Sequence, residues 1–158
     1  MKKKMLLLCF LVLGSIIKII AINKYIKRNI IKLLLVLNKR QMSFRLMNQW
    51  VKVKQKGKNL SEYFELAGYR KIAIYGMGYI GETLLSELNG TKTEVLYGID
   101  QNADTIYANI DILSLKDDLQ RVDVVVVTAV NSFEAISENI KKKLDCPVVS
   151  IIDVVYDI

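Results

Sequence analysis

Three different spacings of hydrophobic residues follow one another along this chain, and each predicts a different kind of element. The first is an apolar run of 18 residues, from Met5 to Ile22, interrupted only by Gly14, Ser15 and Lys18. As a helix rising about 1.5 Å per residue, this run is roughly 27 Å long, close to the shortest length that spans a bilayer. It predicts a single helix that either crosses a membrane or lies in its interface.

The second spacing, of three or four residues, is typical of an amphipathic helix. Its apolar members are Ile19, Ile22, Ile26, Ile30, Leu33 and Leu37, and the basic side chains of the opposite face are Lys24, Lys27, Arg28, Lys32 and Lys39. Cationic amphipathic helices of this kind lie in the headgroup region of anionic lipid. We therefore predict that residues 1–40 form a membrane-associated helical region whose partner is an anionic membrane surface.

Residues 41–69 have the pattern of a helical connector. The apolar residues that predict its first, amphipathic helix are Phe44, Leu46, Met47, Trp50, Val51 and Val53. We expect Trp50, Tyr63 and Phe64 to pack this connector onto the domain that follows, and we expect residues from about 59 onward to fold without the basic segment.

A second, shorter helix of the connector is predicted after the break at Lys56-Gly57-Lys58. It runs from Glu62 to Ala67, with Asn59 or Ser61 as its cap and Gly68 as its end.

From residue 70 onward, short apolar runs alternate with helical patterns. The runs predict strands at Lys71–Tyr75, Glu94–Asp100, Ile110–Leu113, Val122–Val130 and Pro147–Ile152. The helical patterns lie at Tyr79–Leu88, at Asp117–Arg121 as one turn, and from a capping box Asn131-x-x-Glu134 to about Leu144. This alternation predicts an α/β domain over residues 70–158, a small doubly wound parallel sheet of about five strands in the order 3-2-1-4-5.

A glycine motif, Tyr75-Gly76-Met77-Gly78-Tyr79-Ile80-Gly81, joins the first strand of this domain to its first helix. In such a motif the first glycine permits a tight turn, the second lets a diphosphate approach the backbone, and the third lets helix and strand pack closely. The free N–H groups at the start of the helix then hold phosphate oxygens. The pattern predicts a Rossmann-like nucleotide-binding domain, with residues 76–81 in contact with the ligand.

Asp100 ends the second predicted strand, 19 residues after Gly81, where a carboxylate accepts hydrogen bonds from ribose hydroxyls. A carboxylate at this position repels a 2′-phosphate, so NAD(H) is favoured, with a nucleotide-sugar or NADP as alternatives. The alternative role for Asp100 is to cap the turn into Gln101.

The carboxyl end of the fourth predicted strand borders the same crevice. Thr128, Ala129 and Asn131 are therefore further candidates for ligand contact, although Asn131 is favoured as a helix cap. The full set of predicted ligand-binding residues is Gly76, Met77, Gly78, Tyr79, Ile80, Gly81, Asp100, Thr128, Ala129 and Asn131.

Charge is divided unevenly along the chain. Residues 1–61 hold 15 of the 23 Lys and Arg residues and no acid, while the remainder carries all 16 Asp and Glu. The basic segment is interleaved with aliphatic side chains instead of aromatic ones, which favours membrane over nucleic acid as the anionic partner. A secretory signal peptide is the other alternative, but no small-x-small cleavage site follows. The excess of basic residues after the apolar run places the domain on the cytoplasmic face of the membrane.

The inventory of reactive residues argues against catalysis by this chain alone. There is no histidine, no Tyr-x-x-x-Lys pair and no second domain for a substrate. The two cysteines, Cys9 and Cys146, lack metal-ligand spacing, and Cys146 is expected to be a small buried residue. We predict no catalytic residue and no metal site, and whether the chain is an enzyme stays open.

Residues from about Asn48 onward, roughly 110 of 158, resemble a small Rossmann-like module of bacterial surface (capsular) polysaccharide biosynthesis proteins. The residues that carry the resemblance are Asn48-x-Trp50-x-x-x-Lys54-Gln55-x-Gly57, Leu60-Ser61-x-Tyr63-Phe64, Ile72-Ala73-Ile74-Tyr75-Gly76-Met77-Gly78, Tyr97-Gly98-Ile99-Asp100 and Val122-Asp123-Val124-Val125-Val126-Val127-Thr128. The arrangement is similar to the N-terminal domain of sugar O-acyltransferases of the left-handed β-helix type. In that family the domain receives a nucleotide-sugar, whereas acyl transfer belongs to hexapeptide repeats that this chain lacks.

The resemblance implies a module that serves polysaccharide assembly, with glycosyltransferases or other assembly proteins as partners. Two alternatives remain open. One is an oxidoreductase or sugar-modifying subunit whose catalytic residues come from a partner chain. The other is a regulatory domain, since the glycine turn and the acid ending the second strand are also similar to the nucleotide-sensing domains of potassium channels.

Overall fold

The computed structural model describes the backbone of residues 2–158 and the side chains of residues 18–158. The chain divides into two compact units, residues 1–40 and residues 41–158. Helix α1, Lys2–Gln55, begins in the first unit and ends in the second. The elements of the second unit that follow it are α2 (Ser61–Leu66), β1 (Lys71–Tyr75), α3 (Tyr79–Leu88), β2 (Glu94–Ile99), η1 (Ala103–Thr105), β3 (Asp111–Leu113), β4 (Val124–Val127), α4 (Phe133–Lys141), β5 (Val148–Ser150) and α5 (Ile151–Tyr156).

The three helical segments predicted before residue 56 are one continuous helix, α1. It ends at Gln55 and is followed by Gly57, whose φ of +74° lets the N–H groups of Gly57 and Lys58 bond back to the carbonyls of Lys54 and Val53. Residues 5–17 of the apolar run lie outside the residues whose side chains are described. Between residues 18 and 158, no helix has a stretch both long and apolar enough to span a bilayer.

The described part of the first unit exposes apolar and basic side chains together. Ile19, Ile22 and Ile26 of the predicted apolar face are about half exposed or more. Ile31 and Leu35 are also exposed, at 48% and 62%, and at 100° per residue they lie on the side of the lysines. The separation of apolar from basic faces between residues 18 and 40 is therefore partial.

The predicted α/β architecture and strand order are confirmed in the second unit. Its sheet has five parallel strands in the order β3-β2-β1-β4-β5. All five residues of β1 pair with β2, and Ile72–Tyr75 pair with Val124–Val127 of β4, so β1 is the central strand. The order reverses between β1 and β4, which is where ligands bind in open sheets of this kind.

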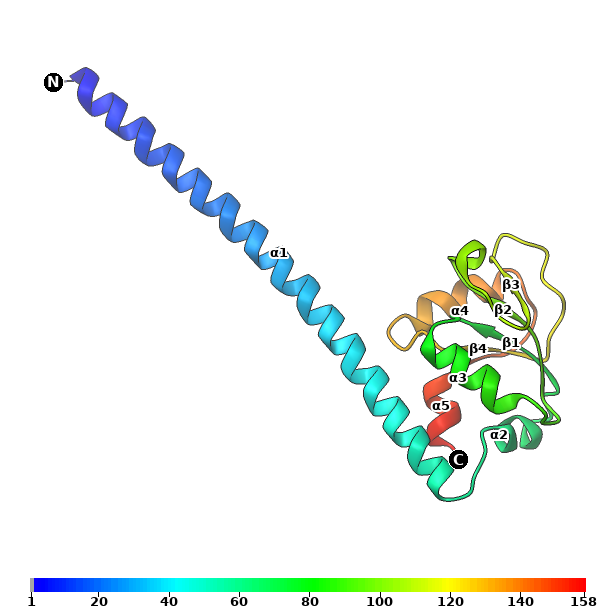
Figure 1. Ribbon diagram of the computed structural model, residues 1–158. Coiled ribbons are helices and arrows are strands. Elements are labelled where there is room, and N and C mark those ends of the chain that lie inside the picture. The colour runs from blue at the N-terminus through cyan, green and yellow to red at the C-terminus, as the bar shows by residue number, and fades with distance from the viewer. Residues whose placement is uncertain (1) are drawn as a thin grey trace. The chain divides into compact units, whose positions relative to one another are not determined.

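Side chains alternate between the two faces of the sheet and form two hydrophobic clusters. Ile72 and Ile74 of β1 join a cluster with residues of α1, α2, α3 and α5. Ala73 and Tyr75 join the other cluster, on the face covered by α4. Figure 1 shows α3 and α5 on one side of the strands and α4 on the other. Because β1 and β4 are buried on both faces, their sequences are almost wholly apolar.

The end of α1 belongs to the core of the second unit. Leu46, Trp50 and Val53 are at most 3% exposed in the first cluster, and Phe64 of α2 is fully buried. The predicted packing of Trp50, Tyr63 and Phe64 is therefore confirmed. Phe44 and Val51, predicted on the same face, are 73% and 49% exposed, since they lie on the opposite side of the helix.

The prediction of Asn59 or Ser61 as the cap of α2 is wrong, because the residue before the helix is Leu60, whose side chain forms no capping hydrogen bond. The Asn59 carboxamide oxygen accepts a hydrogen bond from the Ser61 N–H at 2.9 Å, and Glu62 accepts one from the Asn59 N–H at 3.0 Å. Gly68, with φ of +75°, follows the end of the helix as predicted.

Three further local predictions are wrong. Residues 117–121 are not helical, because Asp117 accepts the Ser114 N–H in a turn and the Gln120 carbonyl accepts the Tyr97 hydroxyl. The last strand stops at Ser150, whose hydroxyl accepts the Ile152 N–H and begins α5.

The predicted capping box at Asn131 is also absent. The residue before α4 is Ser132, so Glu134 is the second helical residue, one position short of the reach that a capping box needs.

Candidate functional site

The glycine turn lies at the carboxyl end of the central strand. Gly76 has φ of +95°, and its N–H donates to the Ile99 carbonyl of β2 at 2.8 Å. A Cβ on Gly81 would lie 2.2 Å from the Gly76 carbonyl oxygen. The first and third glycines thus have the steric roles that the motif predicts, a left-handed turn and close packing of α3 on β1.

Gly78 differs from its two neighbours because the space beside it is open. No heavy atom lies within 4 Å of the Cβ that a larger residue would carry there. Gly78 immediately precedes α3, so the N–H groups of Tyr79, Ile80 and Gly81 have no carbonyl four residues earlier within the helix. These N–H groups and the α3 dipole can stabilise an anion at this end of the helix.

The side chains around this open space point in different directions. Tyr79 is 89% exposed, and Ile80 is partly buried against the first cluster. Met77 is 2% exposed and packs beside Gly98 of β2, where a Cβ would lie 2.7 Å from the Met77 Cγ. The Met77 side chain therefore lies in the hydrophobic core and not in the open space beside Gly78.

Asp100 contacts the glycine turn directly. Its Oδ2 accepts a hydrogen bond from the Met77 N–H at 2.9 Å, and its Oδ1 accepts one from the Asn102 N–H at 2.9 Å. The second bond caps the turn after β2, which is the alternative role that the sequence suggested for Asp100. The first joins the end of β2 to the glycine turn, a contact that sequence reasoning missed.

Thr128 and Ala129 border the turn on its β4 side. The Thr128 hydroxyl, which is buried, is within hydrogen-bond distance of the Tyr75 and Gly76 carbonyls at 3.1 and 2.5 Å. A Cβ on Gly76 would lie 2.8 Å from that hydroxyl and 3.7 Å from the Ala129 nitrogen. The fold therefore brings Gly76, Thr128 and Ala129 together. Asn131 is exposed, and Ser132 occupies its predicted place at the start of α4.

Sequence reasoning also missed Glu87, at the other end of α3. Its side chain is 8% exposed and accepts hydrogen bonds from the Trp50 indole at 2.6 Å, the Lys54 ammonium at 3.1 Å and the Leu60 N–H at 2.8 Å. The available signal was its place between Leu84 and Leu88, which puts Glu87 on the buried side of the helix.

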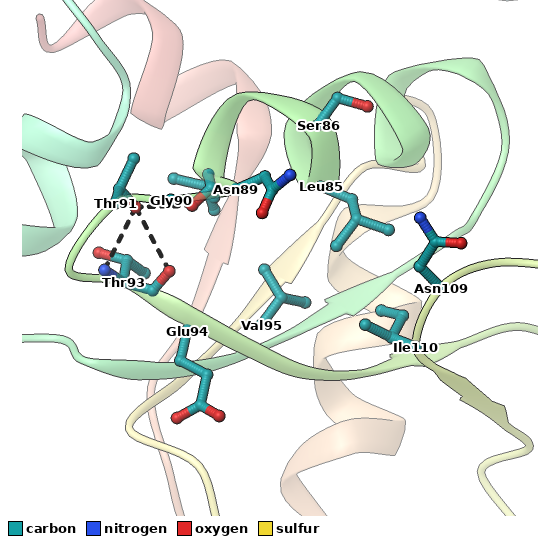
Figure 2. Close-up of a pocket in the computed structure, with 11 residues that line it drawn as sticks. Leu85, Ser86, Asn89, Gly90, Thr91, Thr93, Glu94, Val95, Asn109 and Ile110 are labelled. Carbon is teal, nitrogen blue, oxygen red and sulfur yellow. Dashed lines mark hydrogen bonds between the residues drawn. The ribbon is translucent and has the colours of Figure 1, made fainter.

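A cavity of the second unit lies at the amino-terminal end of β2, away from the glycine turn at the carboxyl end of β1. It has a volume of about 380 Å³ and is bounded by the end of α3, the start of β2 and residues 109 and 110. Figure 2 shows Leu85, Val95 and Ile110 as its apolar wall, with Thr91 and Thr93 joined by hydrogen bonds. Its lining contains Glu94 and no Lys or Arg, so it is poorly suited to a phosphate.

Reactive side chains do not gather at the glycine turn. Across the described residues, no group of three His, Cys, Asp or Glu is placed to hold a metal ion. Cys146, expected to be buried, is only partly buried. This partial burial raises the pKa of its thiol, so the thiol is protonated at neutral pH and a weak nucleophile. Burial likewise raises the pKa of Tyr97 to about 12, and its hydroxyl donates to the Gln120 carbonyl. What the turn offers is backbone N–H groups and one carboxylate, a set that can bind a ligand.

Comparisons of this chain with protein-family models, with curated proteins and with solved structures find no match.

Proposed function

We propose that this protein is a membrane-associated nucleotide-binding module that serves bacterial surface polysaccharide biosynthesis and is non-catalytic by itself. Its favoured ligand is NAD(H), with a nucleotide-sugar as the alternative. One observation carries the proposal: the open backbone at Gly78 and the start of α3 lie next to the Asp100 carboxylate, which accepts the Met77 N–H at 2.9 Å.

The binding mode follows from the hydrogen-bonding capacity of this arrangement. A diphosphate accepts hydrogen bonds from the N–H groups of Tyr79, Ile80 and Gly81, in the space that a side chain at residue 78 would fill. A carboxylate has about four lone-pair sites, and Asp100 uses two of them for Met77 and Asn102. The remaining two can accept the ribose hydroxyls.

Membrane association is supported by charge and exposure. Residues 1–61 carry 15 Lys and Arg without an acid, and the described residues between 19 and 37 expose isoleucine and leucine side chains. Each basic residue near an anionic surface is worth about 1 kcal/mol, so even a partly segregated helix binds such a surface. Placement on the cytoplasmic face is supported by the basic residues after the apolar run.

The place in polysaccharide biosynthesis, and the glycosyltransferases proposed as partners, rest on the motif resemblance alone. The lack of a catalytic couple among the residues at the turn supports a binding role over an enzymatic one.

The ligand proposal is tested by calorimetry on the full chain in detergent, with NAD(H), NADP(H), uridine diphosphate sugars and adenosine diphosphate. Gly78→Val should abolish binding, because the valine side chain occupies the space proposed for the phosphates. The φ of residue 78, −82°, is acceptable to valine, so the fold should be kept. The matched control is Asn89→Val, which adds the same side chain at an exposed, extended position at the other end of α3. Absence of binding by every nucleotide, or equal binding by both variants, contradicts the proposal.

The membrane proposal is tested by sedimentation of the full chain with vesicles. Anionic vesicles should retain more of the protein than neutral ones. Salt should weaken this preference, because dissolved ions screen the attraction between basic side chains and anionic lipid. Equal retention by the two vesicle types argues against an electrostatic membrane anchor.

A ligand-responsive regulatory role is a second candidate, supported by Glu87. This residue lies on α3, the helix that begins at the candidate site, and it bonds to Trp50, Lys54 and Leu60 of the preceding helices. A change at the start of α3 is thereby linked to the end of α1. Hydrogen exchange at residues 46–55, with and without bound nucleotide, tests this role; unchanged protection rules against it.

A further inference from the structure

The end of α1 has two opposite faces, and only one is occupied by the domain. Leu46, Trp50 and Val53 are buried in the core of the second unit. The other face exposes a narrow row of uncharged side chains, which we call the outer seam: Gln41, Phe44, Asn48, Val51 and Gln55. Phe44 is 73% exposed and Val51 is 49% exposed.

The outer seam has the spacing of a helix–helix contact. Its members recur at intervals of three and four residues, so that Gln41, Asn48 and Gln55 occupy one heptad position and Phe44 and Val51 the other. At 100° per residue, all five lie within a narrow stripe. A stripe limited to these two positions is the seam of a coiled coil, narrower than the apolar face of a helix packed on a globular core.

Basic side chains flank the outer seam on both sides. Arg45 and Lys52 border one edge, and Lys54, which pairs with Glu87 at 3.1 Å, borders the other. Residues 1–61 contain no acid, so Arg45 and Lys52 have no acidic neighbour on their own helix, whereas Lys54 already pairs with Glu87.

Three kinds of occupant could cover this seam, and its chemistry distinguishes them. Lipid is disfavoured because three of the five side chains are amides, which hydrocarbon cannot hydrogen-bond. A second copy of α1 is disfavoured because it would place arginine and lysine against arginine and lysine along both edges. The occupant must therefore hydrogen-bond the amides and bring acidic side chains to the basic edges. A helix with acidic flanks does both, since its own amides pair with Gln and Asn and its carboxylates pair with the basic edges.

We propose that the outer seam docks an amphipathic helix of another protein, with Asp or Glu on both sides of its apolar stripe. This interaction is separate from nucleotide binding, because the seam and the glycine turn use different residues. The amide positions set the register of the two helices, and the charged edges select the partner.

The test measures binding of two labelled synthetic helices to the full chain in non-ionic detergent by fluorescence anisotropy. Both peptides carry leucine and one central asparagine in their seams; one has glutamate at every flanking position and the other has lysine. The glutamate peptide should bind, and the lysine peptide should not. Phe44→Gln combined with Val51→Gln should weaken binding by about tenfold or more, since both apolar members of the seam are lost. The matched control is Leu66→Gln, which removes an apolar side chain that is 90% exposed elsewhere.

A charge-reversed variant gives an independent check. Arg45→Glu combined with Lys52→Glu should weaken binding of the glutamate peptide and strengthen binding of the lysine peptide, because one of the two edges is reversed while Lys54 stays basic. Equal binding of the two peptides by the wild-type protein, or binding of neither, overturns the proposal. It is also overturned if the seam variant dissociates a dimer of the protein, which assigns the seam to a second copy. Loss of vesicle binding with unchanged peptide binding assigns the seam to lipid instead.

Discussion

The indole N–H of Trp50 donates a 2.6 Å hydrogen bond to the Glu87 carboxylate, joining the end of α1 to the end of α3. Trp50 is 3% exposed and the Glu87 side chain 8%, so the contact is largely shielded from water. Glu87 also accepts the Leu60 N–H at 2.8 Å, which holds the start of α2. One carboxylate of α3 therefore bonds both to α1 and to the residue before α2.

Replacing Glu87 should destabilise the fold more than replacing an exposed acid. Glu87→Ala leaves the Trp50 and Leu60 N–H groups without their partner, at a cost of about 2–3 kcal/mol in the free energy of unfolding. Glu65→Ala is the control, because Glu65 forms only an exposed ion pair with Lys92 and should change stability by about 0.5 kcal/mol or less. Urea unfolding of both variants makes the comparison, and equal midpoints would refute the role of Glu87.

The second and third glycines of the motif, Gly78 and Gly81, should respond differently to replacement by alanine. Gly81→Ala places a Cβ 2.2 Å from the Gly76 carbonyl oxygen and should cost about 1–3 kcal/mol or more, because backbone must move. Gly78→Ala meets no atom within 4 Å and should leave the melting temperature nearly unchanged. The measurement is the melting temperature of each variant relative to the wild type. Similar losses in both would mean that the space beside Gly78 is not open.

Asp100 is expected to set cofactor preference. Asp100→Ala removes ribose hydrogen bonds worth about 1.5–3 kcal/mol, roughly 10- to 150-fold in affinity for NAD. Asp100→Arg should improve NADP relative to NAD, because a guanidinium pairs with the 2′-phosphate. Both variants should also lower stability, since Met77 and Asn102 lose their acceptor.

The matched control for Asp100 is Asp104, an exposed acid in the 3₁₀ turn that follows. Asp104→Arg changes the charge equally but should leave the ratio of NAD to NADP affinity unaltered. An unchanged ratio in Asp100→Arg would favour a nucleotide-sugar over a dinucleotide.

Asp123 should make stability depend on acid pH. Hydrogen bonds from the Lys71 and Arg70 N–H groups, both 2.8 Å, lower its pKa in the folded state. A lowered folded pKa means that its contribution is fully present above the unfolded value of about 3.9 and is lost as pH falls through the folded pKa.

The difference in melting temperature between the wild type and Asp123→Asn should therefore be full near pH 6 and should close at more acid pH. Asp118→Asn, in an exposed loop, is the control and should show no such difference. A difference that stays constant down to about pH 2.5 would contradict the assignment.

Truncation should show where the folded domain begins. Removing residues 1–40 leaves Leu46, Trp50 and Val53 in the core, whereas removing residues 1–58 deletes all three. The expectation that residues from about 59 onward fold alone is therefore revised: the shorter chain should melt at a lower temperature or fail to fold. Circular dichroism of both truncated chains decides this.

Sequence patterns predict some segments of the domain correctly and neighbouring segments wrongly. The strand and helix around the glycine motif are at the predicted residues, Lys71–Tyr75 and Tyr79–Leu88. There the local signals agree, since an apolar run, obligatory glycines and a helical pattern follow without interruption. The helical turn predicted at residues 117–121 is wrong because the conformation there depends on the distant Tyr97 hydroxyl and on the packing of Leu115 and Leu119.

The sequence by itself determined the α/β class, the strand order, the glycine turn and the charge division, because these depend on periodicity, glycine sterics and composition. Only the tertiary structure decided that Asp100 bonds to the Met77 N–H, that Thr128 covers Gly76 and that Glu87 holds Trp50. Each of these contacts joins residues 23 to 52 positions apart. Local patterns carry no information on such pairs, because the register and packing that bring them together are settled by the whole fold.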